Sequence, residues 1–186
     1  MFEGEPLYHI NTHLSARVAM LKPDWNEESN PQILYDRFLK AVSLTGAEFM
    51  ERIRYYGKVW MPVRVLVQEA FNSRTDHHSS GRIMVLKQNM PWMQHLFELE
   101  EEHNLTGAIH YIIFPDSKDW RIRAMPVTPA SFELRRKIRS EWLGLVNEDL
   151  SAKAGIEGCV FVHTTGFIGG NKTMEGALQM AIKCLE

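Results

Sequence analysis

Apolar residues recur at helical spacing through the first part of the chain. Between residues 34 and 56 they fall mostly three or four positions apart, which predicts a long helix with one apolar face. These positions are Leu34, Phe38, Val42, Phe49, Ile53 and Tyr56. Asn30 is suited to cap this helix, with Pro31 at its first position. Pro62 is expected to break or kink it, and residues 63–71 are predicted to form a second helix.

The later part of the chain switches to short apolar runs that are typical of β-strands. Four such runs occur, at residues 82–86, 108–114, 120–127 and 159–163. The second and third are separated by "PDSKD", which predicts an antiparallel hairpin. Helices are expected after Pro91, from near Ser140 to before Gly155, and after a threonine cap at Thr173. Residues 73–81, "SRTDHHSSG", are expected to be a polar loop.

These patterns together predict an α/β chain with a mixed, α+β-like sheet. Residues 1–72 are expected to be mainly helical, and residues 73–186 to form a domain of about four strands and three helices. The chain has 186 residues and 45% of them are hydrophobic. That is enough for one core, or for one domain plus part of another.

Composition narrows the class of protein further. The formal net charge is −2 and the pI is about 6.5, so contact with nucleic acid would need a local basic patch. No apolar run approaches the roughly 20 residues of a membrane span. Cys159 and Cys184 lie in apolar segments and are expected to be reduced core residues. The acidic N-terminus lacks the character of a transit peptide, so we expect a soluble intracellular protein with no targeting signal in this chain.

A glycine-rich segment, "GFIGGNKTMEGAL" at residues 166–178, is the first candidate site. It follows an apolar strand and precedes a helical pattern, and a glycine-rich turn at a helix N-terminus favours anions. Lys172 would add positive charge and Asn171 and Thr173 would add donors, while His163 at the strand's end would reach the same ligand. The spacing fits neither a Walker A loop nor a dinucleotide-binding fingerprint. The alternative is a strand-to-helix connection that binds nothing.

Basic residues supply the second candidate site. Arg121 and Arg123 stand at i and i+2 on a predicted strand, so they share a face, with Trp120 on the opposite face. If that face turns toward the glycine segment, the two arginines offer phosphate contacts; otherwise they are an exposed strand face. "RRKIR" at residues 135–139 is the densest basic cluster and would either follow an RNA backbone or solubilise the start of the next helix.

Two clusters of metal-type ligands are better explained as solvated surface. Asp76, His77 and His78 spell the letters DHH, but they fall in a predicted polar loop and no upstream His and Asp residues at suitable spacing accompany them. "ELEEEH" at residues 98–103 holds four carboxylates that form a continuous acidic face, and it is expected to be an exposed helix end. No metal-ligating residue is therefore expected in this chain.

Several segments resemble a known family. "FVHTTGFIGGNKTMEGAL" at residues 161–178 resembles the C-terminal signature of the melanocyte-proliferating-gene family, 3′–5′ RNA exonucleases of the DHH phosphoesterase superfamily. Further segments match in order and spacing, namely "GEPLYHINTHLSARVAMLKPDWN", "GKVWMPVRVLVQEA", "MPWMQHLFELE", "WRIRAMPV" and "IEGCVFVH". The resemblance therefore extends through almost the whole chain.

The resemblance implies one half of a two-part enzyme. In the family, an N-terminal DHH domain holds a divalent metal, usually manganese, and a C-terminal DHH-associated domain binds the substrate. Gly169, Gly170, Asn171 and Lys172 would be the glycine-rich motif of that second domain, with His163 as a neighbour. Some relatives have His and Arg at the last two positions; lysine keeps the charge but loses the bidentate fork of arginine. Residues 1–72 would then be the end of the metal domain and a helical linker, and residues 73–186 the substrate-binding domain.

These observations leave two hypotheses for function. In the first, the chain is the C-terminal part of a metal-dependent RNA exonuclease, binds single-stranded RNA or a nucleotide phosphate, has no catalytic residues of its own and is inactive alone. In the alternative, it is a non-catalytic binding, regulatory or dimerisation module that could form a homodimer. A self-sufficient hydrolase with metal at His77 and His78 is disfavoured. The resemblance places the family in the nucleus and mitochondrion, and no membrane partner is expected.

Overall fold

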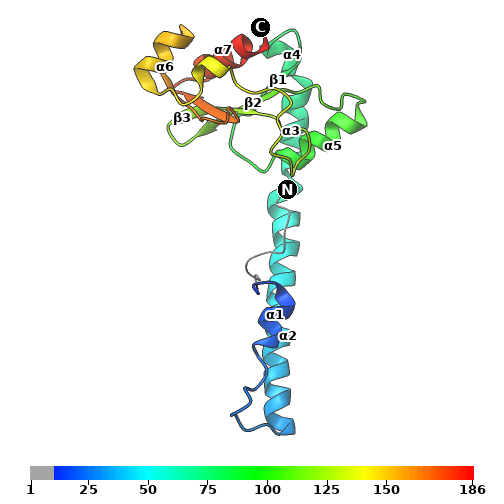
Figure 1. Ribbon diagram of the computed structural model, residues 1–186. Helices are drawn as coiled ribbons and strands as arrows, with labels where there is room; N and C mark the ends of the chain where they lie inside the picture. Colours follow the sequence, from blue (N-terminus) through cyan, green and yellow to red (C-terminus); the bar gives the residue numbers. More distant parts are fainter. Residues whose placement is uncertain (1–10) are drawn as a thin grey trace. The chain divides into compact units, whose positions relative to one another are not determined.

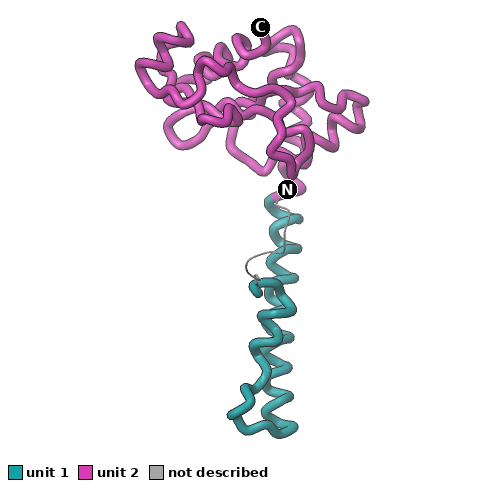
Figure 2. Tube along the Cα trace, viewed as in Figure 1, with its two compact units in different colours: residues 1–59 teal, residues 60–186 magenta. Residues whose placement is uncertain are grey.

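The computed structural model describes residues 11–186 and divides the chain into two compact units. These are residues 1–59 and residues 60–186 (Figure 2). The division falls before the boundary at residue 72 that was expected from sequence. The acidic start of the chain, and the first residues of the family-like segment that begins at Gly4, lie outside the described residues.

The first unit is a short helix against a long one. Helix α1 is Leu14–Ala19 and helix α2 is Pro31–Tyr55 (Figure 1). The predicted cap is confirmed: the Asn30 side chain accepts a hydrogen bond from the backbone N–H of Ile33 at 2.9 Å. Arg17 of α1 forms an ion pair with Glu48 of α2, which ties the two helices together.

Much of the apolar surface of α2 stays exposed to solvent. The predicted apolar face is present, but α1 is six residues long and covers only part of it. Eight large apolar residues of α2 are 45–65% exposed: Leu34, Tyr35, Phe38, Leu39, Val42, Phe49, Met50 and Ile53. Soluble proteins normally expose single, scattered apolar residues, whereas here eight of them lie on one helix.

A π-helical turn, Tyr56–Trp60, follows α2 and precedes helix α3, Val63–Asn72. The predicted second helix at residues 63–71 is confirmed, because α3 covers these residues and begins directly after Pro62. Val67 and Phe71 of α3 are fully buried in the core of the second unit. Helix α3 is therefore part of the core of the second unit.

Within residues 11–186 the strands form one five-stranded mixed sheet in the order β1-β2-β3-β5-β4. The strands are β1 Ile83–Val85, β2 Tyr111–Asp116, β3 Asp119–Ala124, β4 Cys159–Val162 and β5 Ile168–Asn171. Strands β1 and β2 are parallel, and every other neighbouring pair is antiparallel. The predicted hairpin between β2 and β3 is confirmed, as is the mixed α/β class.

Helices cover both faces of the sheet, but unevenly. Helix α6, Asn147–Ala154, and helix α7, Met174–Leu185, pack on one face through a core that includes Ile122, Leu150 and Met180. Helix α3 and helix α5, Met93–Glu102, pack on the other face over β1 and β2. That second face is left open over β3, β5 and β4.

Four local predictions were wrong. The helix end at residues 98–103 was expected to be exposed, but Glu100 within it is fully buried. Residues 74–77 form a short helix, α4 Arg74–His77, instead of a loop. The single helix expected from near Ser140 is interrupted: a 3₁₀ turn, Ser140–Trp142, is separated from α6 because Gly144 adopts a left-handed φ of 77°. The sheet also has a strand more than expected, since the glycines at 169 and 170 belong to β5.

Both cysteines are free and buried, as predicted. Burial raises the pKa of the Cys159 and Cys184 thiols, which keeps them protonated and unreactive at neutral pH. No helix in the described part of the chain is long and apolar enough to cross a bilayer.

His110 makes the stability of the second unit sensitive to acid. Burial lowers its pKa below the usual 6.5, with additional lowering by Arg82, Arg136 and Arg135, while Glu100 opposes the shift. The unfolded chain therefore takes up this proton first as pH falls. We expect the contribution of His110 to the free energy of unfolding to be constant above pH 6.5 and to decrease as the pH is lowered from 6.5. In urea titrations from pH 7 to pH 5, His110→Gln should show a shallower decline than the unmodified chain; equal declines would contradict this role.

Candidate functional site

The glycine segment is a strand rather than a turn. Strand β5 lies between β3 and β4, with Gly169 opposite Ile122 and Val162, and Gly170 opposite Arg121. Its backbone therefore pairs on both sides within the sheet. The prediction that these glycines form a turn at a helix N-terminus was wrong.

Glycine is required in β5 because its neighbours approach closely. A Cβ on Gly170 would lie 2.7 Å from Nη1 of Arg121, and one on Gly169 would lie 3.0 Å from the carbonyl oxygen of Phe161. The guanidinium of Arg121 lies across this gap, 5.3 Å from the Phe161 ring centre. Gly170 thus leaves room for the guanidinium of Arg121 on the open face of the sheet, whereas Gly169 is close to the backbone of β4.

The side chain of Asn171 forms hydrogen bonds that stabilise the end of β5. It is fully buried. Its Nδ2 donates to the carbonyl oxygen of Glu157 at 2.8 Å, and its Oδ1 accepts from the backbone N–H of Thr173 at 2.9 Å. Thr173 in turn caps α7 by accepting from the backbone N–H of Gly176 at 3.0 Å, which confirms the predicted threonine cap. The amide of Asn171 is therefore used inside the protein.

The structure separates the predicted site residues into two groups. Lys172 and Thr173 are exposed at the end of β5 that leads into α7. His163 pairs with the opposite end, where its backbone N–H donates to Ile168 at 2.9 Å. Because a strand rises about 3.3 Å per residue, Ile168 and Lys172 are roughly 13 Å apart. The sequence had suggested that His163 and Lys172 are neighbours. In the structure they lie at opposite ends of β5.

Arg121 and Arg123 share the open face of β3, as their spacing predicted, while Trp120 packs against the core on the other face. Arg121 is held by Asp116, whose Oδ2 accepts from Nε at 3.0 Å. Asp119 adds an ion pair at 3.6 Å. Arg123 forms no ion pair with any residue from 11 to 186 and lies 6.0 Å from the Trp92 ring centre. Arg123 is thus the more available of the two for an external anion.

Arg123 and His163 meet in a cleft of about 610 Å³ at the edge of this open face. The cleft is lined by Met93, Arg123, Ala124, Pro126, Pro129, Ala130, Ser131, Phe132, Leu134, Lys137, His163, Thr165 and Phe167. It combines three basic side chains with apolar and aromatic walls. Ligand pockets are typically of this size, mostly apolar and supplied with a few polar groups.

Local contacts fix the walls of this cleft. Nδ1 of His163 is 2.9 Å from the Thr165 hydroxyl, and the imidazole meets the Phe167 ring edge-on with 4.9 Å between centres. The carbonyl oxygen of Lys137 accepts from the Tyr111 hydroxyl at 2.9 Å, which holds the basic segment beside β2. The side chain of Lys137 is exposed and makes no ion pair within the described residues.

The basic residues of the run at 135–139 have different contacts in the structure. Arg135 is nearly buried and bound to Glu100, and Arg139 pairs with Glu141. Only Lys137 of this run lines the cleft. Sequence reasoning found the run but could not separate these roles, and it missed Phe132 and Phe167 because no local pattern marks them as neighbours.

The described residues offer no metal site. Across residues 11–186, no three or more His, Cys, Asp or Glu side chains lie close enough to hold an ion. In the segment that spells DHH, Nδ1 of His78 is 2.7 Å from the Ser80 hydroxyl, which gives that ring a local structural role.

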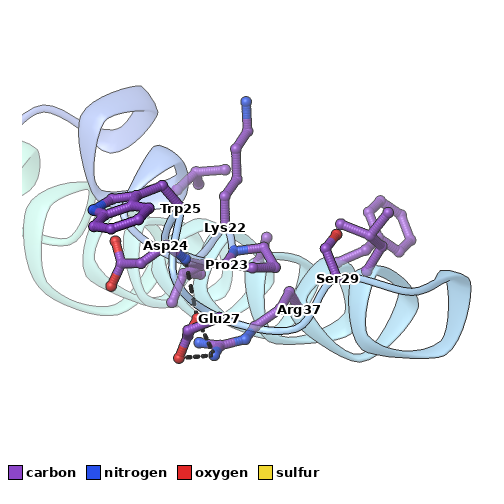
Figure 3. Close-up of a pocket in the computed structure, with 12 residues that line it drawn as sticks. Lys22, Pro23, Asp24, Trp25, Glu27, Ser29 and Arg37 are labelled. Atoms are coloured by element: carbon purple, nitrogen blue, oxygen red, sulfur yellow. Dashed lines mark hydrogen bonds and ion pairs between the residues drawn. The ribbon is translucent and has the colours of Figure 1, made fainter.

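A second groove belongs to the first unit. It has a volume of about 560 Å³ and lies along α1, α2 and the loop between them (Figure 3). Trp25 on its rim is 97% exposed, and Arg37 is paired with Glu27 at 3.0 Å. The groove is mainly apolar, so its chemistry differs from that of the basic cleft.

Comparison with known proteins gives the family. The family model described as MYG1 exonuclease, uncharacterised protein family UPF0160, matches residues 1–185. The chain belongs to the MYG1 exonuclease family. This confirms the resemblance drawn from the C-terminal signature and the ordered segments before it.

Relatives in this family are longer than the chain. It is 46% identical over 182 residues to the MYG1 protein of Dictyostelium discoideum, covering 97% of the chain and 55% of the relative. It is 44% identical over 181 residues to the MYG1 exonuclease of Rattus norvegicus and to that of Homo sapiens, covering 96% of the chain and 47% and 48% of those relatives. The chain spans about half the length of the curated relatives it matches. No solved structure gives a significant match.

Proposed function

We propose that this chain holds RNA for a metal-dependent 3′–5′ RNA exonuclease, while hydrolysis of the phosphodiester takes place on residues outside it. The observation that carries the proposal is the match of residues 1–185 to the exonuclease family. The chain spans about half of the relatives named exonucleases, so in this proposal it contributes the substrate-binding part of a DHH-type enzyme.

The basic cleft supplies the physical basis for binding. Arg123, Lys137 and His163 line it, and neither Arg123 nor Lys137 is neutralised by an ion pair within the described residues. The net charge of the whole chain is slightly negative, so attraction of a polyanion has to come from such a local group. Phosphate binding by a few basic side chains is salt-dependent and indifferent to sequence, which suits an exonuclease.

A second phosphate contact is proposed at the other end of β5. Lys172 is exposed there beside Thr173, and Gly170, between the two ends of β5, leaves room for the guanidinium of Arg121. A strand of RNA following this open face would pass from the cleft toward Lys172. Asn171 then acts by positioning Thr173 rather than by touching the ligand.

The metal of the family does not fit the residues described here, because residues 11–186 contain no suitable ligand group. We propose that the divalent ion, manganese by resemblance, is held by residues outside this chain. The chain's own residues then bind and orient RNA and move no proton in the reaction.

Variants at the two ends of β5 test this proposal. Arg123→Gln should weaken binding of a labelled single-stranded RNA and lower the dependence of log affinity on log salt by about one, because one phosphate contact is lost. Lys172→Gln should have the same kind of effect. Lys118→Gln, an exposed lysine in the β2–β3 turn, is the matched control and should change neither quantity. If all three variants had the same RNA affinity and the same salt dependence, the proposed binding face would be wrong.

The alternative function is a non-catalytic dimerisation module, and the exposed apolar residues of α2 favour it. Sedimentation equilibrium across a range of protein concentrations separates the two. A concentration-dependent dimer that binds no RNA would support the alternative, and an RNA-binding monomer would exclude it.

A further inference from the structure

We infer that the cleft beside β3 takes a single unpaired nucleotide, with its base stacked on Phe132 and its phosphate on Arg123 and Lys137. The inference rests on the proposed function and names the form of substrate that the site accepts. It predicts that the chain binds single-stranded nucleic acid and rejects a blunt duplex.

Phe132 stands at the tip of a strap between β3 and the 3₁₀ turn. The strap folds back on itself: the backbone N–H of Val127 donates to the carbonyl oxygen of Glu133 at 2.8 Å, and Pro126 bridges to Leu134. At the tip, the backbone N–H of Glu133 donates to the Ser131 hydroxyl at 2.9 Å. The Phe132 side chain is fully exposed, although it lines the cleft.

The base of the strap is fixed by a buried ion pair. Arg135 donates to both carboxylate oxygens of Glu100, at 2.6 and 2.7 Å, and also to the carbonyl oxygens of Ile109 and Pro126. Phe132 is therefore carried by a strap whose base is fixed, which reduces the backbone ordering needed when a planar ligand stacks on its ring. An exposed aromatic ring on a fixed loop has no packing role in the fold.

The charges around the cleft select the chemistry of the ligand. Arg123 and Lys137 lack ion-pair partners among residues 11–186, whereas Arg121 and Arg135 on the same side of the sheet are both paired. His163 adds a ring nitrogen at the rim. Cations beside an aromatic platform and proline walls match a nucleotide, which carries a phosphate next to a flat apolar base.

Geometry limits the ligand to an unpaired base. The cleft has a volume of about 610 Å³, which is within the usual range for a pocket that takes one small ligand. A base within a duplex is stacked on both faces and cannot reach an exposed ring on the protein. Stacking is available to every base, so the site should tolerate any sequence.

Equilibrium binding to the purified chain tests the inference. The probe is a fluorescein-labelled single-stranded RNA, and the comparison is a blunt duplex of the same sequence. Phe132→Ala should weaken single-strand binding about tenfold or more, since stacking on an aromatic ring typically contributes that much per base. It should leave the salt dependence unchanged because no charge is lost. Val127→Ala removes another exposed apolar side chain of the same strap and should bind normally.

A strand carrying 2-aminopurine gives an independent readout, because stacking of that base on Phe132 should quench its fluorescence in the unmodified chain and not in Phe132→Ala. Single-strand binding that Phe132→Ala leaves intact, or equal binding of the duplex, would overturn the inference while leaving the proposed function standing. Failure of the unmodified chain to bind any RNA would overturn both.

Discussion

Glu100→Gln lowers the free energy of unfolding of the second unit by about 3–5 kcal/mol, because it leaves the guanidinium of Arg135 buried without its counter-charge. Glu100 has no exposed side-chain surface and that of Arg135 is 6% exposed. The carboxylate also accepts the backbone N–H of Ile109 at 2.9 Å, so it joins α5 to the start of β2 and to the strap. Urea denaturation followed by circular dichroism measures the loss.

Two further variants identify the cause of that loss. Glu101→Gln changes an exposed carboxylate on the same helix and should alter stability by less than about 0.5 kcal/mol. Replacing both partners, Glu100→Leu with Arg135→Met, removes the buried charge and should be less destabilising than Glu100→Gln alone. A double variant that is as unstable as the sum of its single changes would show that the two residues act independently.

Gly176→Ala destabilises the protein by about 2–4 kcal/mol, although alanine is the better helix former. A Cβ at this position would overlap the amide group of Asn171, which is buried and held in place by Glu157 and Thr173. The overlap displaces Asn171, so the cap of α7 and the end of β5 are both disturbed. Thermal unfolding gives the size of the effect.

Gly46 in α2 provides the control. Apart from its chain neighbours and the backbone of its own helix, no atom lies within 4 Å of a Cβ built there, so Gly46→Ala should be neutral or stabilising by up to about 1 kcal/mol. In an Asn171→Ala background the cost of Gly176→Ala should largely disappear. If Gly176→Ala raised the melting temperature of the unmodified chain, the account of Asn171 as a fixed packing partner would be wrong.

Parts of the fold could be predicted because their signals are local. Asn30 and Pro31 start α2, and Pro62 precedes α3, since capping and proline chemistry act over one helical turn. The β2–β3 hairpin follows in the same way from two apolar runs around a short polar turn. These elements need no knowledge of the rest of the molecule.

Strand β5 could not be predicted from its own residues. "IGGN" has one apolar side chain, and its other three residues have poor strand propensity, so pairing with β3 and β4 determines its conformation. The residues expected to form one anion site are therefore separated: Arg123 and His163 line the cleft, whereas Lys172 lies at the far end of the strand.

The cleft itself depends on contacts that are distant in sequence. Phe132 stands over it because Arg135 reaches Glu100, and Lys137 faces it because its neighbour Ile138 donates its backbone N–H to the carbonyl oxygen of Gly166 at 3.0 Å. Neither pairing leaves a periodic or compositional signal. A basic run could be seen in the sequence, but which of its members is free could not.

The most direct test is to incubate the purified chain with a 5′-labelled single-stranded RNA and manganese, with and without chelator, and to follow retention and shortening of the RNA on gels. We expect retention that weakens as salt rises, with no shortening in either condition. Absence of retention at low salt would contradict RNA binding by this chain. Chelator-sensitive shortening from the 3′ end would contradict the claim that the metal centre lies outside it.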